Sequence, residues 1–150
     1  MKVAFFIYPQ PLLDLIKIFE GLRLKAYRCP AGIWTIGYGH IGNDVFENLA
    51  ITEQQADDLL KRDVSKCLSQ VFTLSPILIN AGENRILAIG DFVFNLGIGR
   101  YRASTLRKRI ASEDWLSASY EVRKWVFSGG KKSKGLVIRR EIEAELLLKG

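Results

Sequence analysis

The sequence predicts an α+β fold, in which one β-hairpin segment is embedded in a mainly helical chain. Apolar residues recur at helical spacing along most of the 150 residues, whereas residues 26–40 are rich in aromatic, β-branched and glycine residues. Hydrophobic residues make up 48% of the chain, enough for a core without disulfides or metals. We therefore expect one domain over 1–150, with a small hairpin lobe at about 22–60 and a larger helical lobe at about 72–150.

The first helix is predicted over about 10–20 and is grouped with the helical lobe. Its apolar positions recur every three or four residues, and Gly21 follows as a stop signal. The apolar run before Pro9 has only six residues, which is too short for a secretion signal or a membrane span. We expect residues 3–8 to form an extended segment that packs on the core.

The hairpin is predicted around the turn Pro30-Ala31-Gly32, which is followed by the strand Ile33–Ile36. Alternation along that strand places Thr35 on one face and Trp34 and Ile36 on the other. Thr52-Glu53-Gln54-Gln55 is a capping box, which predicts a helix from about Thr52 to about Phe72. A helix of this length is suited to join the two lobes.

The C-terminal half is predicted to be helical apart from one loop. Residues 82–96 are very apolar and end at Gly97, which predicts a central buried helix. Ser104 is expected to cap a short basic helix over 105–111, and Ser112 a helix over about 113–126. A loop over 128–132 and a last helix over about 136–148 complete the chain.

Charge is distributed unevenly. The net charge is +6, but residues 1–96 carry 9 basic and 10 acidic side chains, whereas residues 97–150 carry 13 basic and 6 acidic ones. The basic half predicts contact with an anionic partner, with a solvated basic face as the plain alternative. Two cysteines and a single histidine match no zinc-site spacing, so we expect no metal.

Glu20, Cys29 and Thr35 form the candidate catalytic set. Cleavage of a glycosidic bond needs an acid to protonate the leaving oxygen and a group on the opposite face of the sugar to position water or to attack carbon. Glu20 ends an apolar helix, where desolvation would raise its pKa and keep its proton near neutral pH. The hairpin brings Cys29 and Thr35 together to hold and polarise a water. Taken singly, each residue is better explained as structural.

The spacing of these three residues resembles that of phage-type lysozymes, glycoside hydrolase family 24. FEGLRLKAY over residues 19–27 and WTIGYGH over residues 34–40 surround the set. Downstream, the chain resembles the helical-lobe landmarks of the family at FNLG (94–97), STL (104–106), Trp125 with Gly129-Gly130, and GL (135–136) with RR (139–140). The resemblance covers about residues 12–148. In that family the middle position of the set is Asp or, in a subset, Cys.

The resemblance implies a lysozyme-like fold and an endolysin that hydrolyses the β-1,4 bond between N-acetylmuramic acid and N-acetylglucosamine in bacterial peptidoglycan. It assigns Glu20 as the general acid and Cys29 and Thr35 to the attacking water, with no cofactor. A neutral thiol cannot supply the charge of an aspartate, so we expect either that Arg28 or Arg23 depresses the pKa of Cys29 or that Thr35 carries more of the positioning.

Further substrate contacts are expected from the helical lobe. The candidates are Phe94, Asn95, Ser104, Arg139 and Arg140. Each has a structural alternative. These are core packing for Phe94 and helix capping for Asn95 and Ser104. One of the two arginines is expected to be a solvated helix residue, and the other could pair with Glu20. His40 is expected to be hydrogen-bonded or ion-paired rather than catalytic.

Three other functions remain open from the sequence. A lytic transglycosylase would cleave the same bond without adding water. A cell-wall amidase would use Cys29 and His40, and a basic binding module would use residues 100–140 without catalysis. We favour the lysozyme, acting as a monomer without nucleic acid, which stays in the host cytoplasm until a membrane-permeabilising partner lets it reach the wall.

Overall fold

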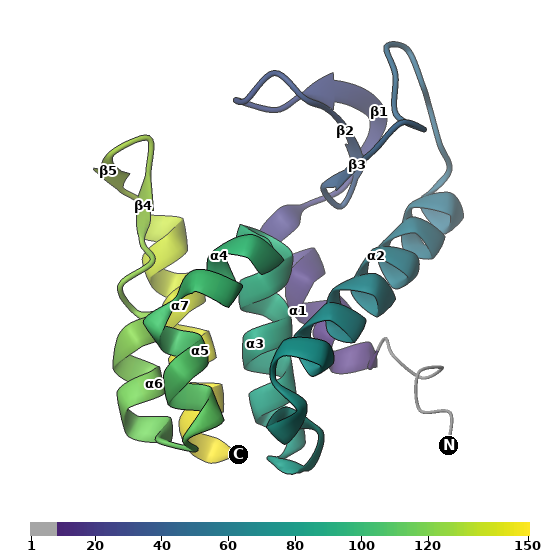
Figure 1. Cartoon of the computed structure of the whole chain (residues 1–150). Coiled ribbons are helices and arrows are strands. Elements are labelled where there is room, and N and C mark those ends of the chain that lie inside the picture. The colour runs from purple at the N-terminus through teal and green to yellow at the C-terminus, as the bar shows by residue number, and fades with distance from the viewer. Residues whose placement is uncertain (1–8) are drawn as a thin grey trace. The chain divides into compact units, whose positions relative to one another are not determined.

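A computed structural model of the chain describes residues 9–150 (Figure 1). The chain forms two compact units, Met1–Lys66 and Cys67–Gly150. Helices dominate and two small antiparallel sheets accompany them, which confirms the predicted α+β class. The predicted extended segment over 3–8 lies outside the described residues. Within 9–150, no helix combines the length and apolar character that a membrane crossing requires.

The first unit begins with helix α1, Gln10–Glu20, and a three-stranded antiparallel sheet (Figure 1). α1 buries Leu12, Leu13 and Ile16, as its spacing predicts, and ends at Gly21, whose φ is +71°. The strands are β1 (Arg23–Arg28), β2 (Trp34–Gly37) and β3 (His40–Ile41). The predicted hairpin is therefore present, and a third short strand extends it.

The register of the sheet fixes the turn between β1 and β2. Tyr27 pairs with Thr35 and Arg28 with Trp34, so Cys29 is the first residue beyond the paired positions. The amide of Cys29 donates to the carbonyl of Ile33 at 3.0 Å, and the amide of Gly32 donates to the carbonyl of Cys29 at 2.7 Å. These two bonds close a tight turn that holds the thiol beside β2.

Helix α2, Glu53–Leu74, runs through the boundary between the two units. Its N-terminus is the predicted capping box: the amide of Gln55 donates to the hydroxyl of Thr52 at 3.1 Å, and the amide of Thr52 donates to the side-chain oxygen of Gln55 at 2.8 Å. α1 belongs to the unit of the hairpin, whereas the sequence analysis grouped it with the helical lobe.

The second unit is helical and is built around α3, Glu83–Leu96. Seven consecutive residues of α3, Leu87–Val93, are buried, as predicted for a central helix. Its other elements are the 3₁₀-helix η2 (Pro76–Asn80), the short helices α4 (Ile98–Ala103), α5 (Thr105–Ala111) and α6 (Trp115–Val122), and the last helix α7 (Lys134–Lys149).

Two local predictions for this unit are wrong. Ser112 does not cap the following helix, because its hydroxyl donates back to the carbonyls of α5 at Lys108 and Arg109. Glu113 then takes a φ of +56°, and Asp114 caps α6 by accepting from the amide of Ser117 at 3.1 Å. The predicted loop over 128–132 is a hairpin instead, formed by β4 (Phe127–Ser128) and β5 (Lys131–Lys132).

Candidate active site

Glu20 is the last residue of α1, and its carboxylate lies against the turn between β2 and β3. A Cβ atom at Gly39 would lie 3.4 Å from the Oε1 atom of Glu20. The φ of Gly39 is +88°, a conformation that residues with side chains rarely adopt. The turn geometry therefore favours glycine at this position, and a Cβ atom there would stand in van der Waals contact with the carboxylate.

Lys17 links the last turn of α1 to the rest of the first unit. Its Nζ atom lies 3.0 Å from the Oδ1 atom of Asp57 on α2 and 5.4 Å from the centre of the Tyr38 ring. The hydrogen bond to Asp57 raises the pKa of Lys17 above its ordinary value. Lys17 lies one helical turn before Glu20 and Tyr38 precedes Gly39, so these contacts join the end of α1 to the same turn and to α2.

Cys29 and Thr35 meet at the hairpin turn, as the sequence predicts. Thr35 is buried, and its hydroxyl donates to the carbonyl of Ile33 at 2.9 Å. The pKa of the Cys29 thiol is lowered, first by a backbone hydrogen bond at Ile33, then by the backbone at Ala31 and the side chain of Thr35. Hydrogen bonds to a thiolate favour its charged form, so this turn stabilises negative charge at the sulfur.

The cause of this pKa shift differs from the two cations suggested by the sequence. The guanidinium of Arg23 lies over the Tyr27 ring at 4.1 Å, and that of Arg28 lies over the Trp34 ring at 4.8 Å. Both cations are thus stacked on aromatic rings of the sheet. The principal stabilisation of the Cys29 thiolate comes from the turn backbone.

His40 is held between two carboxylates. Its Nδ1 atom lies 2.8 Å from Asp63 of α2, and its Nε2 atom lies 3.0 Å from Asp44. Burial of the ring alone would lower the pKa of His40, but the hydrogen bonds to Asp63 and Asp44 outweigh burial and raise it above 6.5. An imidazolium engaged on both nitrogens is suited to brace β3 on α2, and is poorly suited to act as the base of a Cys29–His40 pair.

The two arginines of α7 are buried in ion pairs of the second unit, and neither is solvated. Arg139 donates from Nε and Nη2 to the two carboxylate oxygens of Asp91 on α3, at 2.8 and 2.7 Å. Arg140 is fully buried, donates to the amide oxygen of Asn95, and lies 3.2 Å from the carboxylate of Glu143. Burial raises the pKa of Glu143 well above its usual range.

Each remaining substrate candidate also has a structural partner. The side chain of Phe94 is partly buried and packs against the core of the second unit. Ser104 caps α5, as the capping alternative predicted: its hydroxyl accepts from the amide of Arg107 at 3.0 Å and donates to the carbonyl of Tyr101 at 2.7 Å. Direct contact of Phe94, Asn95, Ser104, Arg139 or Arg140 with a sugar therefore stays a proposal.

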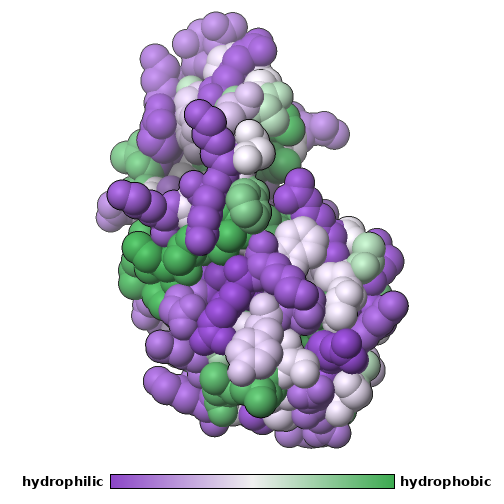
Figure 2. Space-filling model, turned by 90° about the vertical axis from the view of Figure 1, so that its left-hand side faces the viewer, coloured by the Kyte–Doolittle hydropathy of each residue, from purple (hydrophilic) through white to green (hydrophobic). Residues whose placement is uncertain are grey.

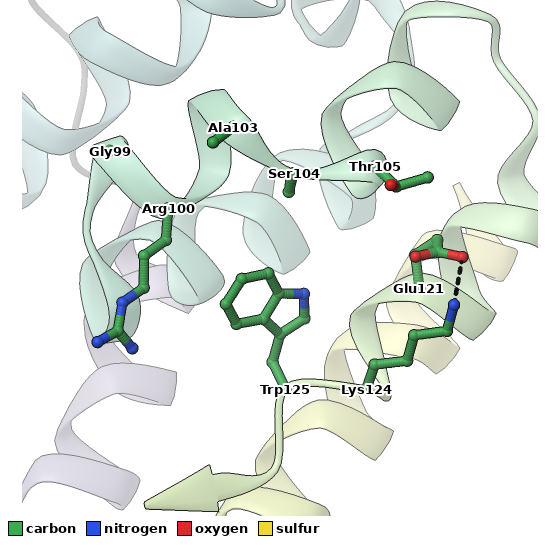
Figure 3. Close-up of a pocket in the computed structure, with 8 residues that line it drawn as sticks. All are labelled: Gly99, Arg100, Ala103, Ser104, Thr105, Glu121, Lys124 and Trp125. Atoms are coloured by element: carbon green, nitrogen blue, oxygen red, sulfur yellow. Dashed lines mark hydrogen bonds and ion pairs between the residues drawn. The ribbon is translucent and has the colours of Figure 1, made fainter.

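Ser104 lies in the wall of a pocket in the second unit (Figure 3). The pocket measures about 670 Å³, and the Trp125 ring points into it. Lys124, in its wall, pairs with Glu121 at 2.8 Å. The complete lining is Gly99, Arg100, Ala103, Ser104, Thr105, Glu121, Lys124 and Trp125.

Sequence reasoning missed Gly39, Lys17 and most of this pocket. Gly39 lies inside the motif over residues 34–40, but only the folded chain shows that its Cβ position faces Glu20. In the sequence Lys17 is an ordinary helix residue, and its ion pair with Asp57 forms only when α2 packs next to it. Within 9–150, no group of three His, Cys, Asp or Glu side chains could hold a metal ion.

A helical chain with a small antiparallel sheet, and a carboxyl group at the end of the first helix, is typical of the lysozyme-like class. The phage lysozyme family profile matches residues 17–143. The chain belongs to this family, which confirms the resemblance predicted from its motifs.

Individual relatives agree with this assignment. The chain is 39% identical to an endolysin of Bacillus phage B103 over 92% of its own length, but spans only 52% of that protein. It is 40% identical to an endolysin of Acyrthosiphon pisum secondary endosymbiont phage 1, covering 89% of this chain and 92% of that one. The solved muramidase domain of SpmX from Asticcacaulis excentricus is 30% identical, with a TM-score of 0.82 over 95% of this chain and 97% of that one.

His40 makes the stability of the first unit depend on pH. Because the pKa of His40 is raised by folding, its contribution is complete below the unfolded value of about 6.5 and is lost as pH rises through the folded value. We expect His40→Gln to lower Tm by about 2–4 °C at pH 6, for a loss of about 1 kcal/mol, and by less at pH 9. Thermal unfolding of both proteins across this range tests the expectation, and a Tm difference that grows with pH would contradict it.

Proposed function

We propose that the chain hydrolyses the β-1,4 bond between N-acetylmuramic acid and N-acetylglucosamine in peptidoglycan, with Glu20 as the general acid. The observation that carries the proposal is the position of the Glu20 carboxylate at the end of α1, against Gly39 and in the same unit as Cys29 and Thr35. Membership of the phage lysozyme family supports it.

In the proposed mechanism, Glu20 gives its proton to the glycosidic oxygen as the bond to the anomeric carbon breaks. A water held by Thr35 and Cys29 attacks that carbon and gives a proton to the Cys29 thiolate, so that one water is added across the bond. The lowered pKa of Cys29 makes the anionic sulfur more accessible than in an ordinary thiol, and in the proposed mechanism this charge takes the place of the carboxylate found in other members of the family.

The second unit is proposed to bind the glycan and the anionic envelope. The pocket beside Ser104 and Trp125 is concave, partly apolar and close to cationic side chains, which suits a sugar with acidic substituents. The excess of basic residues over 97–150 supports contact with the envelope. A monomeric state, and passage from the host cytoplasm to the wall through a membrane-permeabilising partner, complete the proposal.

Glu20→Gln tests the acid most directly. The amide cannot donate a proton to the leaving oxygen, so hydrolysis of purified peptidoglycan should fall by about 100-fold or more. Mass spectrometry of the released muropeptides identifies the chemistry of the unmodified protein at the same time. We expect new reducing ends. Anhydro-sugar products would indicate a transglycosylase, and new amino ends would indicate an amidase. Full activity of the Glu20→Gln variant would exclude Glu20 as the general acid.

Cys29→Asp and Cys29→Ser separate charge from hydrogen bonding at the middle position. Since the ionised form is proposed to act, activity should rise as pH increases through the pKa of the thiol. Cys29→Asp should stay active, and the pH at which its activity rises should move toward the ordinary aspartate pKa of about 3.9. Cys29→Ser should lose activity by about tenfold or more. Equal activity of the serine variant at every pH would show that charge at this position is unnecessary.

A further inference from the structure

The segment 122–140 of the second unit carries seven basic side chains and no acidic one. Four of the seven lie within 4 Å of acidic side chains from outside the segment. The pairs are Arg123 with Glu141, Lys124 with Glu121, Arg139 with Asp91 and Arg140 with Glu143. The three others, Lys131, Lys132 and Lys134, are exposed and have no ion-pair partner within residues 9–150.

These three lysines lie on or directly beside the hairpin of β4 and β5. Gly129 and Gly130 form its turn with φ values of +58° and +80°, which suit a two-residue hairpin turn. No other atoms lie within 4 Å of where a Cβ would stand at either glycine. At its base, the amide of Ser133 donates to the carbonyl of Val126 at 2.8 Å. The hairpin is therefore anchored at its base and open at its tip.

The hairpin also exposes a large apolar side chain. Phe127 is 62% exposed, and it pairs across the strands with Lys132, so both side chains lie on the same face. Along α7, Val137 and Ile138 follow Lys134 and are exposed as well. Figure 2 looks onto the side of the molecule that carries the hairpin and shows hydrophobic and strongly hydrophilic side chains next to one another.

We propose that this hairpin docks on an anionic lipid bilayer, with Phe127 at the boundary between headgroups and acyl chains and the three lysines on lipid phosphates. A hydrated polyanion would satisfy the lysines but leave Phe127 in water, whereas an anionic membrane surface satisfies both. The proposal deepens the envelope contact in the proposed function and is independent of the hydrolytic chemistry.

Co-sedimentation of the full chain with vesicles of phosphatidylglycerol and phosphatidylethanolamine, and with phosphatidylcholine vesicles, tests the proposal. We expect binding to the anionic vesicles only. Each lysine near an anionic surface contributes roughly fivefold to partitioning, so a Lys131→Gln/Lys132→Gln/Lys134→Gln variant should lose about 100-fold. Phe127→Ser should lose up to about tenfold.

A matched control removes the same charge from another exposed surface of this unit. The triple variant Arg102→Gln/Lys108→Gln/Arg109→Gln changes three cations on α4 and α5, far from the hairpin in sequence. It should lose much less binding. An equal loss in this variant would show that only net charge matters and would overturn the assignment to the hairpin.

Phe127→Trp reports insertion directly. Its fluorescence, after subtraction of that of the unmodified protein, should shift to the blue with anionic vesicles, and a spectrum unchanged by vesicles would overturn the proposal. Binding of the unmodified protein to lipid-free sacculi but not to vesicles would also overturn it, because the partner would then be a wall polymer. Hydrolysis of soluble glycan fragments, measured separately, reports on the proposed function and leaves the vesicle result independent.

Discussion

The close approach of the Glu20 carboxylate to the backbone of Gly39 is the constraint on which the first unit depends. It places the end of α1 where the turn between β2 and β3 passes, and a Cβ atom at Gly39 would stand in van der Waals contact with the carboxylate. Two further sets of contacts join the same elements. Lys17 links α1 to α2 and to Tyr38, and His40 links β3 to α2.

The two units use charge in different ways. In the first unit, hydrogen bonds at a turn favour an anionic sulfur at Cys29, and a carboxyl group of the same unit, Glu20, is proposed to donate a proton. In the second, a buried ion pair holds α7 on α3, where Asp91 accepts two bonds from Arg139. Breaking such a pair on one side leaves an uncompensated buried charge, which costs about 3–5 kcal/mol. The paired arginines that resemble a family motif are thus required by the fold, whatever they contribute to binding.

Patterns that depend on neighbouring residues were predicted well from the sequence. The apolar spacing of α1 and α3, the capping box at Thr52 and the cap at Ser104 all use contacts within one or two turns. Ser112 failed as a cap because its hydroxyl had an equally local alternative, the carbonyls behind it.

The candidate site was predicted less completely than the helices. The spacing of Glu20, Cys29 and Thr35 identified the set, and the hairpin brings Cys29 and Thr35 together. The roles of Lys17 and Gly39 could not be predicted, because the residues next to them in the fold come from other elements of the structure. The cause of the lowered pKa of Cys29 could not be predicted either, because it lies in hydrogen bonds of the turn backbone, and every residue has a backbone.

The most direct measurement of the central claim is the kinetic comparison of Gly39→Ala with Gly97→Ala. Both glycines have similar positive φ values, +88° and +94°, but only Gly39 faces Glu20, and nothing lies within 4 Å of the Cβ position at Gly97. Both variants should lose about 1–3 kcal/mol of stability through backbone strain. If the turn positions the acid, Gly39→Ala should also lose about tenfold in kcat on peptidoglycan fragments, while Gly97→Ala keeps it. Equal kcat values in the two variants would contradict the account.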